Sequence, residues 1–116
     1  RLARALNSLY KPRHVVQTTI AIFGRGAKDG DWPRQLPEED AAVSVDSRML
    51  SAHGAVLREV NPRLVLLYGG GWGTMRLHDR TWRVVCYWPA IIAAAAAGGI
   101  HTVSVNGKVK RWSGQL

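Results

Sequence analysis

Apolar residues recur at helical spacing in several parts of the chain. Residues 1–11 and 46–60 each place apolar side chains three or four positions apart, and a proline follows each stretch within two residues. Residues 89–98 consist largely of alanine, the strongest helix former, and begin with a proline, which suits the first turn of a helix. We therefore predict helices over 1–11, 46–60 and 89–98.

Other stretches have the composition of β-strands. Residues 14–23 are mostly β-branched, and residues 63–68 form a short apolar run typical of a buried strand. Residues 74–77 and 81–88 flank a polar turn and are predicted to pair as a hairpin. One face of that hairpin would carry Trp82, Val84, Cys86 and Trp88.

The register of a final hairpin follows from its side chains. A two-residue turn at Asn106 and Gly107 would place valine opposite lysine and mix apolar with charged residues on one face. A three-residue loop with Gly107 as a left-handed bulge instead puts Val103 and Val109 on the same face. This second register predicts a β-ribbon whose other face is polar and basic, with Thr102, Ser104, Lys108 and Lys110.

These elements define the expected fold. At 116 residues, with 47% apolar and 21% charged residues, the chain has the size and composition of one globular domain. Residues 24–37 are rich in glycine and proline and are predicted to form a long loop. We expect a single basic α+β domain over 1–116, with about three helices covering a mainly antiparallel sheet of five or six strands.

Charge is segregated along the sequence. Residues 1–28 and 80–116 carry lysine and arginine but no aspartate or glutamate, and seven of the eight acidic residues lie between Asp29 and Glu59. The formal net charge is +8. Segregated positive charge creates a field that attracts a polyanion.

Familiar catalytic and cofactor motifs are missing from the sequence. The glycine-rich segments 24–30 and 69–74 lack the spacing or the lysine of nucleotide-binding loops. The single cysteine, Cys86, excludes an internal disulfide and a multi-thiolate metal site, and the histidines have no paired metal-ligand spacing. No serine stands in a nucleophile elbow. We therefore expect no cofactor and no metal, and we favour a protein without enzymatic activity.

A membrane-spanning segment is not expected either. Residues 84–107 carry no charge, but alanine dominates their centre and Pro89 interrupts it, whereas membrane insertion is driven by larger apolar residues. The first residues have helical spacing rather than the compact apolar run of a signal peptide. The expected location is the cytoplasm or the interior of a particle.

The favoured function is binding of nucleic acid, RNA included, or of another polyanion. Lysine and arginine neutralise phosphates, and an exposed tryptophan can stack on an unpaired base. No helix-turn-helix, zinc-finger or RNA-recognition signature narrows the partner further. The predicted binding residues are Lys11, Arg13, Thr102, Ser104, Lys108, Lys110, Arg111 and Trp112.

Two alternatives are left open by the sequence. The chain could be a structural subunit of a virion or ribonucleoprotein particle, or a homo-oligomer, with Trp72, Trp82 and Trp88 at the subunit contacts. It could also be a small metal-independent ribonuclease toxin whose catalytic histidines meet only in the folded chain.

Overall fold

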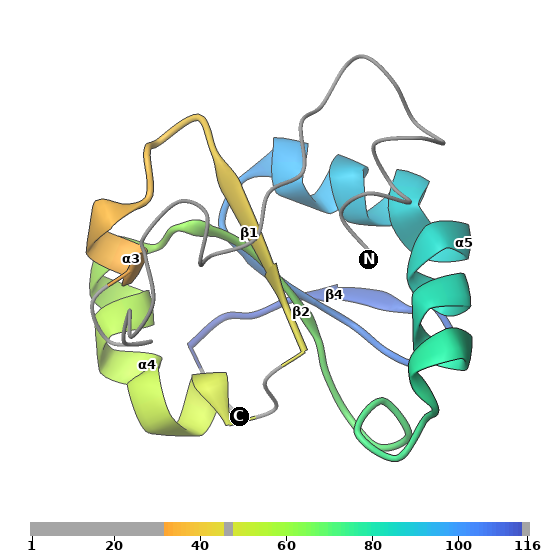
Figure 1. The fold of residues 1–116 in the computed structure, drawn as a ribbon. Helices are drawn as coiled ribbons and strands as arrows, with labels where there is room; N and C mark the ends of the chain where they lie inside the picture. The colour runs from red at the N-terminus through yellow and green to blue at the C-terminus, as the bar shows by residue number, and fades with distance from the viewer. Residues whose placement is uncertain (1–31, 46–47, 115–116) are drawn as a thin grey trace.

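A computed structural model describes residues 32–45 and 48–114 (Figure 1). The predicted helix over 1–11 and strand over 14–23 lie outside these residues. In chain order the elements are α3 (Trp32–Gln35), β1 (Ala41–Ser44), α4 (Met49–Val60), β2 (Arg63–Leu67), α5 (Leu77–Ala97), β3 (Ile100–Val103) and β4 (Val109–Arg111).

The sheet has four strands in the order β1-β2-β3-β4. The strands β1 and β2 run parallel, as do β2 and β3, and only β3 and β4 are antiparallel. The prediction of a mainly antiparallel sheet of five or six strands is therefore wrong, although the α+β class is confirmed. Parallel neighbours require a crossover between them, and here each crossover contains a helix.

The largest error concerns the hairpin predicted over residues 74–88. From Leu77 onward these residues belong to α5, which continues through Pro89 to Ala97. The same segment carries apolar residues at helical spacing, and these are the side chains that α5 buries: Val84, Val85, Trp88, Ile91 and Ala94.

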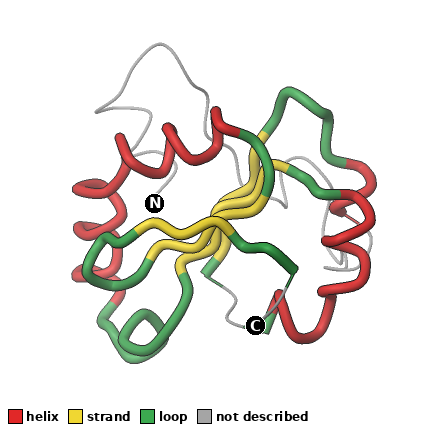
Figure 2. The backbone as a smooth tube through the Cα atoms, turned by 180° about the vertical axis from the view of Figure 1, so that it is seen from behind, coloured by secondary structure: helices red, strands yellow, loops and turns green. Residues whose placement is uncertain are grey.

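Pro89 lies inside α5 rather than in its first turn. A proline within a helix has no amide hydrogen to donate, and its ring crowds the preceding turn. The helix bends part-way along its length in both views of the backbone (Figures 1 and 2), and its single proline accounts for the bend.

The two long helices cover opposite faces of the sheet (Figure 2). Val65, Leu67 and Val103 point toward α5, whereas Leu64 and Leu66 share a core cluster with α4. Because β1, β2 and β3 lie in chain order across the sheet while their helices lie on opposite faces, the two crossovers have opposite handedness. One of them therefore has the rare left-handed form.

Shorter elements also differ from the sequence-based expectation. The α3 turn lies within the predicted loop 24–37, and β1 was not predicted. The side chain of Arg34 on α3 donates to the Glu59 carboxylate of α4 at 2.7 Å, and this hydrogen bond lowers the pKa of Glu59. The ion pair lies at the protein surface and links α3 to α4.

The end of α4 and the beginning of β2 agree with the sequence. Asn61 has φ +48° and its amide donates to the Leu57 carbonyl, so it ends the helix as a left-handed cap. Two residues later, Arg63 starts β2 and donates from Nη1 to the carbonyls of Ala95 and Ala96 at 2.8 and 2.9 Å. A cation at the carbonyl end of α5 complements the helix dipole.

The final hairpin has the predicted register. Val103 pairs with Val109, and Thr102 pairs with Lys110. The amide of Gly107 donates to the Ser104 carbonyl, and Gly107 has φ +85°, as a bulge after a three-residue loop requires. The alternating side chains of β3 and β4 therefore sort onto two different faces.

Candidate nucleic-acid interface

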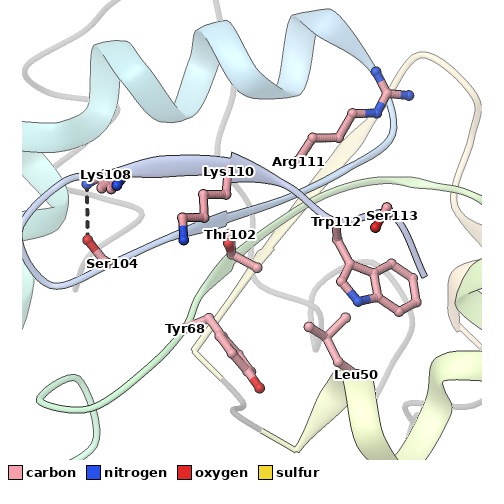
Figure 3. Close-up of a pocket in the computed structure, with 9 residues that line it drawn as sticks. All are labelled: Leu50, Tyr68, Thr102, Ser104, Lys108, Lys110, Arg111, Trp112 and Ser113. Carbon is pink, nitrogen blue, oxygen red and sulfur yellow. Dashed lines mark hydrogen bonds between the residues drawn. The ribbon is translucent and has the colours of Figure 1, made fainter. Parts of the chain in front are cut away.

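A groove lies along the polar face of the β3–β4 hairpin (Figure 3). Its volume is about 450 Å³, within the range of about 300–1,000 Å³ that is typical of ligand pockets. We call it the basic groove. It is lined by Leu50, Tyr68, Thr102, Ser104, Lys108, Lys110, Arg111, Trp112 and Ser113.

Two lysines supply the positive charge on the groove face. Lys108 and Lys110 are exposed and stand two positions apart along the last strand, so they project from the same side of it. None of the residues that line the basic groove is acidic. Within residues 32–45 and 48–114, neither lysine forms an ion pair, so both charges remain available to an anion.

Hydroxyl groups stand beside these lysines. Ser104 Oγ accepts a hydrogen bond from the amide of Lys108 at 3.1 Å, drawn as a dashed line in Figure 3. The amide of Ser104 donates in turn to the Lys108 carbonyl at 2.9 Å. These two bonds hold Ser104 and Lys108 next to each other, while Thr102 pairs with Lys110 across the hairpin.

Two aromatic rings border the same groove. Tyr68 directly follows β2, and Trp112 directly follows β4, where its amide donates to the Ile100 carbonyl at 2.9 Å. Both rings are partly exposed and pack against the core cluster that contains Leu50. The indole Nε1 of Trp112 is buried and finds no hydrogen-bond acceptor among the residues that the structure describes.

Arg111 differs from the two lysines. It faces His101 in the register of the hairpin, and Figure 3 shows its guanidinium turned away from Lys110. The strand alternation therefore directs its charge toward the other face of the hairpin, although the residue still lines the edge of the groove.

His101 is buried on the face opposite the groove. Burial is the main cause that lowers its pKa, and the neighbouring charge of Arg111 lowers it further, while a hydrogen bond with the backbone of Gly99 partly opposes both effects. The Nδ1 atom is buried and has no partner within the described residues. The protonated imidazole would therefore carry an unsatisfied N–H beside a cation.

The lowered pKa of His101 predicts that the stability of the protein depends on pH. The unfolded chain binds the imidazole proton near pH 6.5, whereas the folded chain binds it only at lower pH, so the free energy of unfolding falls as the pH drops below about 6.5. The slope from this one group is at most about 1.4 kcal/mol per pH unit. Urea unfolding between pH 7 and pH 5 should show the decline, and His101→Gln should flatten it. An unchanged decline in the variant would contradict this assignment.

The remaining residues predicted from the sequence are not among the described residues that line the basic groove. Lys11 and Arg13 lie outside the described residues. Trp72 and Trp88 are buried in the core between α5 and the sheet, so they present no surface to a partner. Trp82, in contrast, is 62% exposed on α5, and it is the one of these three tryptophans that could contact another subunit.

The described histidines lie away from the basic groove. His53, His78 and His101 lie on three different elements, and none of them lines the basic groove. Residues 32–45 and 48–114 contain no group of three histidine, cysteine or acidic side chains placed to hold a metal ion. None of the helices in these ranges combines the length and apolar content needed to cross a membrane.

Three lining residues were missed by the sequence analysis, namely Leu50, Tyr68 and Ser113. The sequence pattern assigns Tyr68 to a buried strand and Leu50 to the apolar face of a helix. They reach the groove because α4 and β2 pack next to the hairpin, which no local pattern indicates. No family model matches the chain, and the searches of curated proteins and of solved structures found no similar protein.

Proposed function

We propose that the chain is a non-enzymatic module that binds nucleic acid, or another polyanion, through the basic groove. The observation that supports this function best is the gathering of two lysines, two serines, a threonine and two partly exposed aromatic rings in one groove without an acid. Ammonium groups neutralise phosphates, and hydroxyls donate to phosphate oxygens. Such a module would act in the cytoplasm or within a nucleoprotein particle.

The location of the positive charge matters more for binding than its amount. A net charge of +8 spread evenly would attract any polyanion weakly, whereas lysines on one concave face can contact neighbouring phosphates of the same strand. In the groove, the two lysines project from a strand that is hydrogen-bonded to β3, and β3 is in turn paired with β2. Their backbone positions are therefore held by the sheet.

Salt dependence tests this function. The affinity for a fluorescently labelled oligonucleotide, measured by anisotropy, should fall steeply as the salt concentration rises. The double substitution Lys108→Ala and Lys110→Ala should weaken binding at low salt. It should also reduce the slope of log K against log salt by about 0.7 for each phosphate that the protein no longer neutralises.

A matched control removes the same charge elsewhere. Arg34 and Arg76 are exposed and do not line the groove, so Arg34→Ala with Arg76→Ala lowers the net charge equally. This control should retain the slope of the unmodified protein. Equal slopes for the two double variants would mean that charge acts without a defined site, and an absence of binding at low salt would overturn the proposed function.

A further inference from the structure

The basic groove contains more than a phosphate site requires. Phosphates are bound by exposed cations and hydroxyls on convex surfaces as well as concave ones. Here the lysines share a concavity with Leu50 and the partly exposed rings of Tyr68 and Trp112 (Figure 3). A ligand that satisfies both parts of the groove carries an anionic group next to a flat, apolar one, as a nucleotide does.

The order of these side chains along the last strand supports the same ligand. Lys108, Lys110 and Trp112 alternate with residues of the other face, so two cations and one ring follow one another along a single side of the hairpin. Tyr68 directly follows β2, which lies on the other side of β3, and its amide donates to the Val103 carbonyl at 3.0 Å. It therefore lies beside Ser104, at the Lys108 end of the hairpin, whereas Trp112 lies beside Ile100 at the other end. A strand of nucleic acid laid along the hairpin would thus meet one ring near each end of the pair of lysines, with the phosphate contacts between them.

The indole of Trp112 adds an independent observation. Its N–H is buried without an acceptor in the described part of the chain, and burial of an unsatisfied donor is unfavourable. A small rotation of the ring toward the groove would let the N–H meet an oxygen or ring nitrogen of a ligand. Nucleobases and phosphates both provide such acceptors.

Base stacking distinguishes single strands from duplexes. In a duplex each base face is covered by its neighbours, and a protein reaches only base edges and the backbone. An unpaired base has a free face that an aromatic side chain can cover, which strengthens binding by about 5- to 150-fold per base. On the basis of the proposed function, we infer that the basic groove holds unpaired bases against the rings of Tyr68 and Trp112, and that the protein selects single-stranded over duplex nucleic acid.

Three DNA probes test this inference with the unmodified protein. The first is a labelled single strand, the second is the same strand annealed to its complement, and the third is a strand of equal length whose sugars carry no bases. All three retain the phosphates. At low salt the single strand should bind at least about fivefold more tightly than either of the other probes, because only its bases are free to stack.

Substitutions then assign the effect to the rings. Tyr68→Leu and Trp112→Leu should each weaken binding of the single strand by about fivefold or more and leave binding of the base-free strand unchanged. Trp112→Phe should restore part of the loss. Trp82→Leu is the matched control, since Trp82 is exposed but lies outside the groove, and it should alter none of the affinities.

The outcomes separate the two proposals. If the base-free strand or the duplex binds as tightly as the single strand, the inference fails while salt-dependent binding still supports the proposed function. If none of the probes binds at low salt, the proposed function itself fails. Because the probe comparison uses the unmodified protein, it decides the inference even if a leucine variant does not fold.

Discussion

Replacing Trp72 with alanine should lower the free energy of unfolding by about 3–5 kcal/mol. The indole is 1% exposed, and its Nε1 donates to the Val103 carbonyl at 3.0 Å. The ring also meets Tyr87 edge to face, with ring centroids 6.4 Å apart. The substitution therefore removes a large buried side chain, leaves a cavity and deletes a hydrogen bond that joins the glycine-rich loop to β3. Urea unfolding followed by circular dichroism measures the loss.

Two further variants separate these contributions. Trp72→Phe keeps an aromatic ring, and the Val103 carbonyl still accepts the amide of Tyr68 at 3.0 Å, so an intermediate loss is expected. Trp82→Ala removes a tryptophan that is 62% exposed, and it should change the stability by less than about 0.5 kcal/mol. Similar losses for Trp72→Ala and Trp82→Ala would contradict the described core.

Replacing Gly107 with alanine should destabilise the protein by about 2–4 kcal/mol. Gly107 has φ +85°, a conformation that strains any residue with a Cβ atom. An added Cβ would also lie 2.9 Å from Cε1 of Tyr87. That ring cannot move freely, because its hydroxyl donates to the Val105 carbonyl at 2.8 Å. A rearranged loop would displace Ser104 and Lys108, so affinity for an oligonucleotide should fall as well.

The control for this substitution is another glycine of the chain. Gly73 does not have a positive φ, and a Cβ added there meets no atom within 4 Å. Gly73→Ala should therefore be neutral or stabilise the protein by up to about 1 kcal/mol, through the reduced freedom of the unfolded chain. If Gly107→Ala is as well tolerated as Gly73→Ala in urea unfolding, the bulged loop is wrong.

Six of the nine residues that line the basic groove were predicted from the sequence. The alternation along the final hairpin placed Thr102, Ser104, Lys108 and Lys110 on one face, and their side chains do line one groove. The same alternation, extended two residues beyond Lys110, also separates Arg111 from the lysines and places Trp112 on their face. Tyr68 and Leu50 could not be found in this way, because they lie far from the hairpin in sequence.

The failure at residues 77–88 has a specific physical origin. The segment carries two hydrophobic patterns at once: Trp82, Val84, Cys86 and Trp88 alternate as in a strand, whereas Val84, Val85 and Trp88 continue at helical spacing into the alanine-rich stretch. Both patterns bury apolar side chains. Whether the segment forms a strand or a helix therefore depends on the elements on either side of it. Because β2 and β3 pair in parallel, the chain between them must form a crossover, and α5 provides it.

Elements with strong local signals could be predicted from the sequence: the end of α4 at Asn61, the apolar strand β2, and the bulged hairpin with its basic face. Left-handed caps, glycine bulges and side-chain alternation act over a few residues, so they can be read without the fold. Three features follow from the packing of the whole chain, namely the parallel order of β1, β2 and β3, the burial of Trp72, and the presence of both Tyr68 and Trp112 in the lining of one groove. These features depend on contacts between residues that lie far apart in the chain. Such contacts lower the free energy of the fold only once the helices and strands have packed together, so no local pattern predicts them.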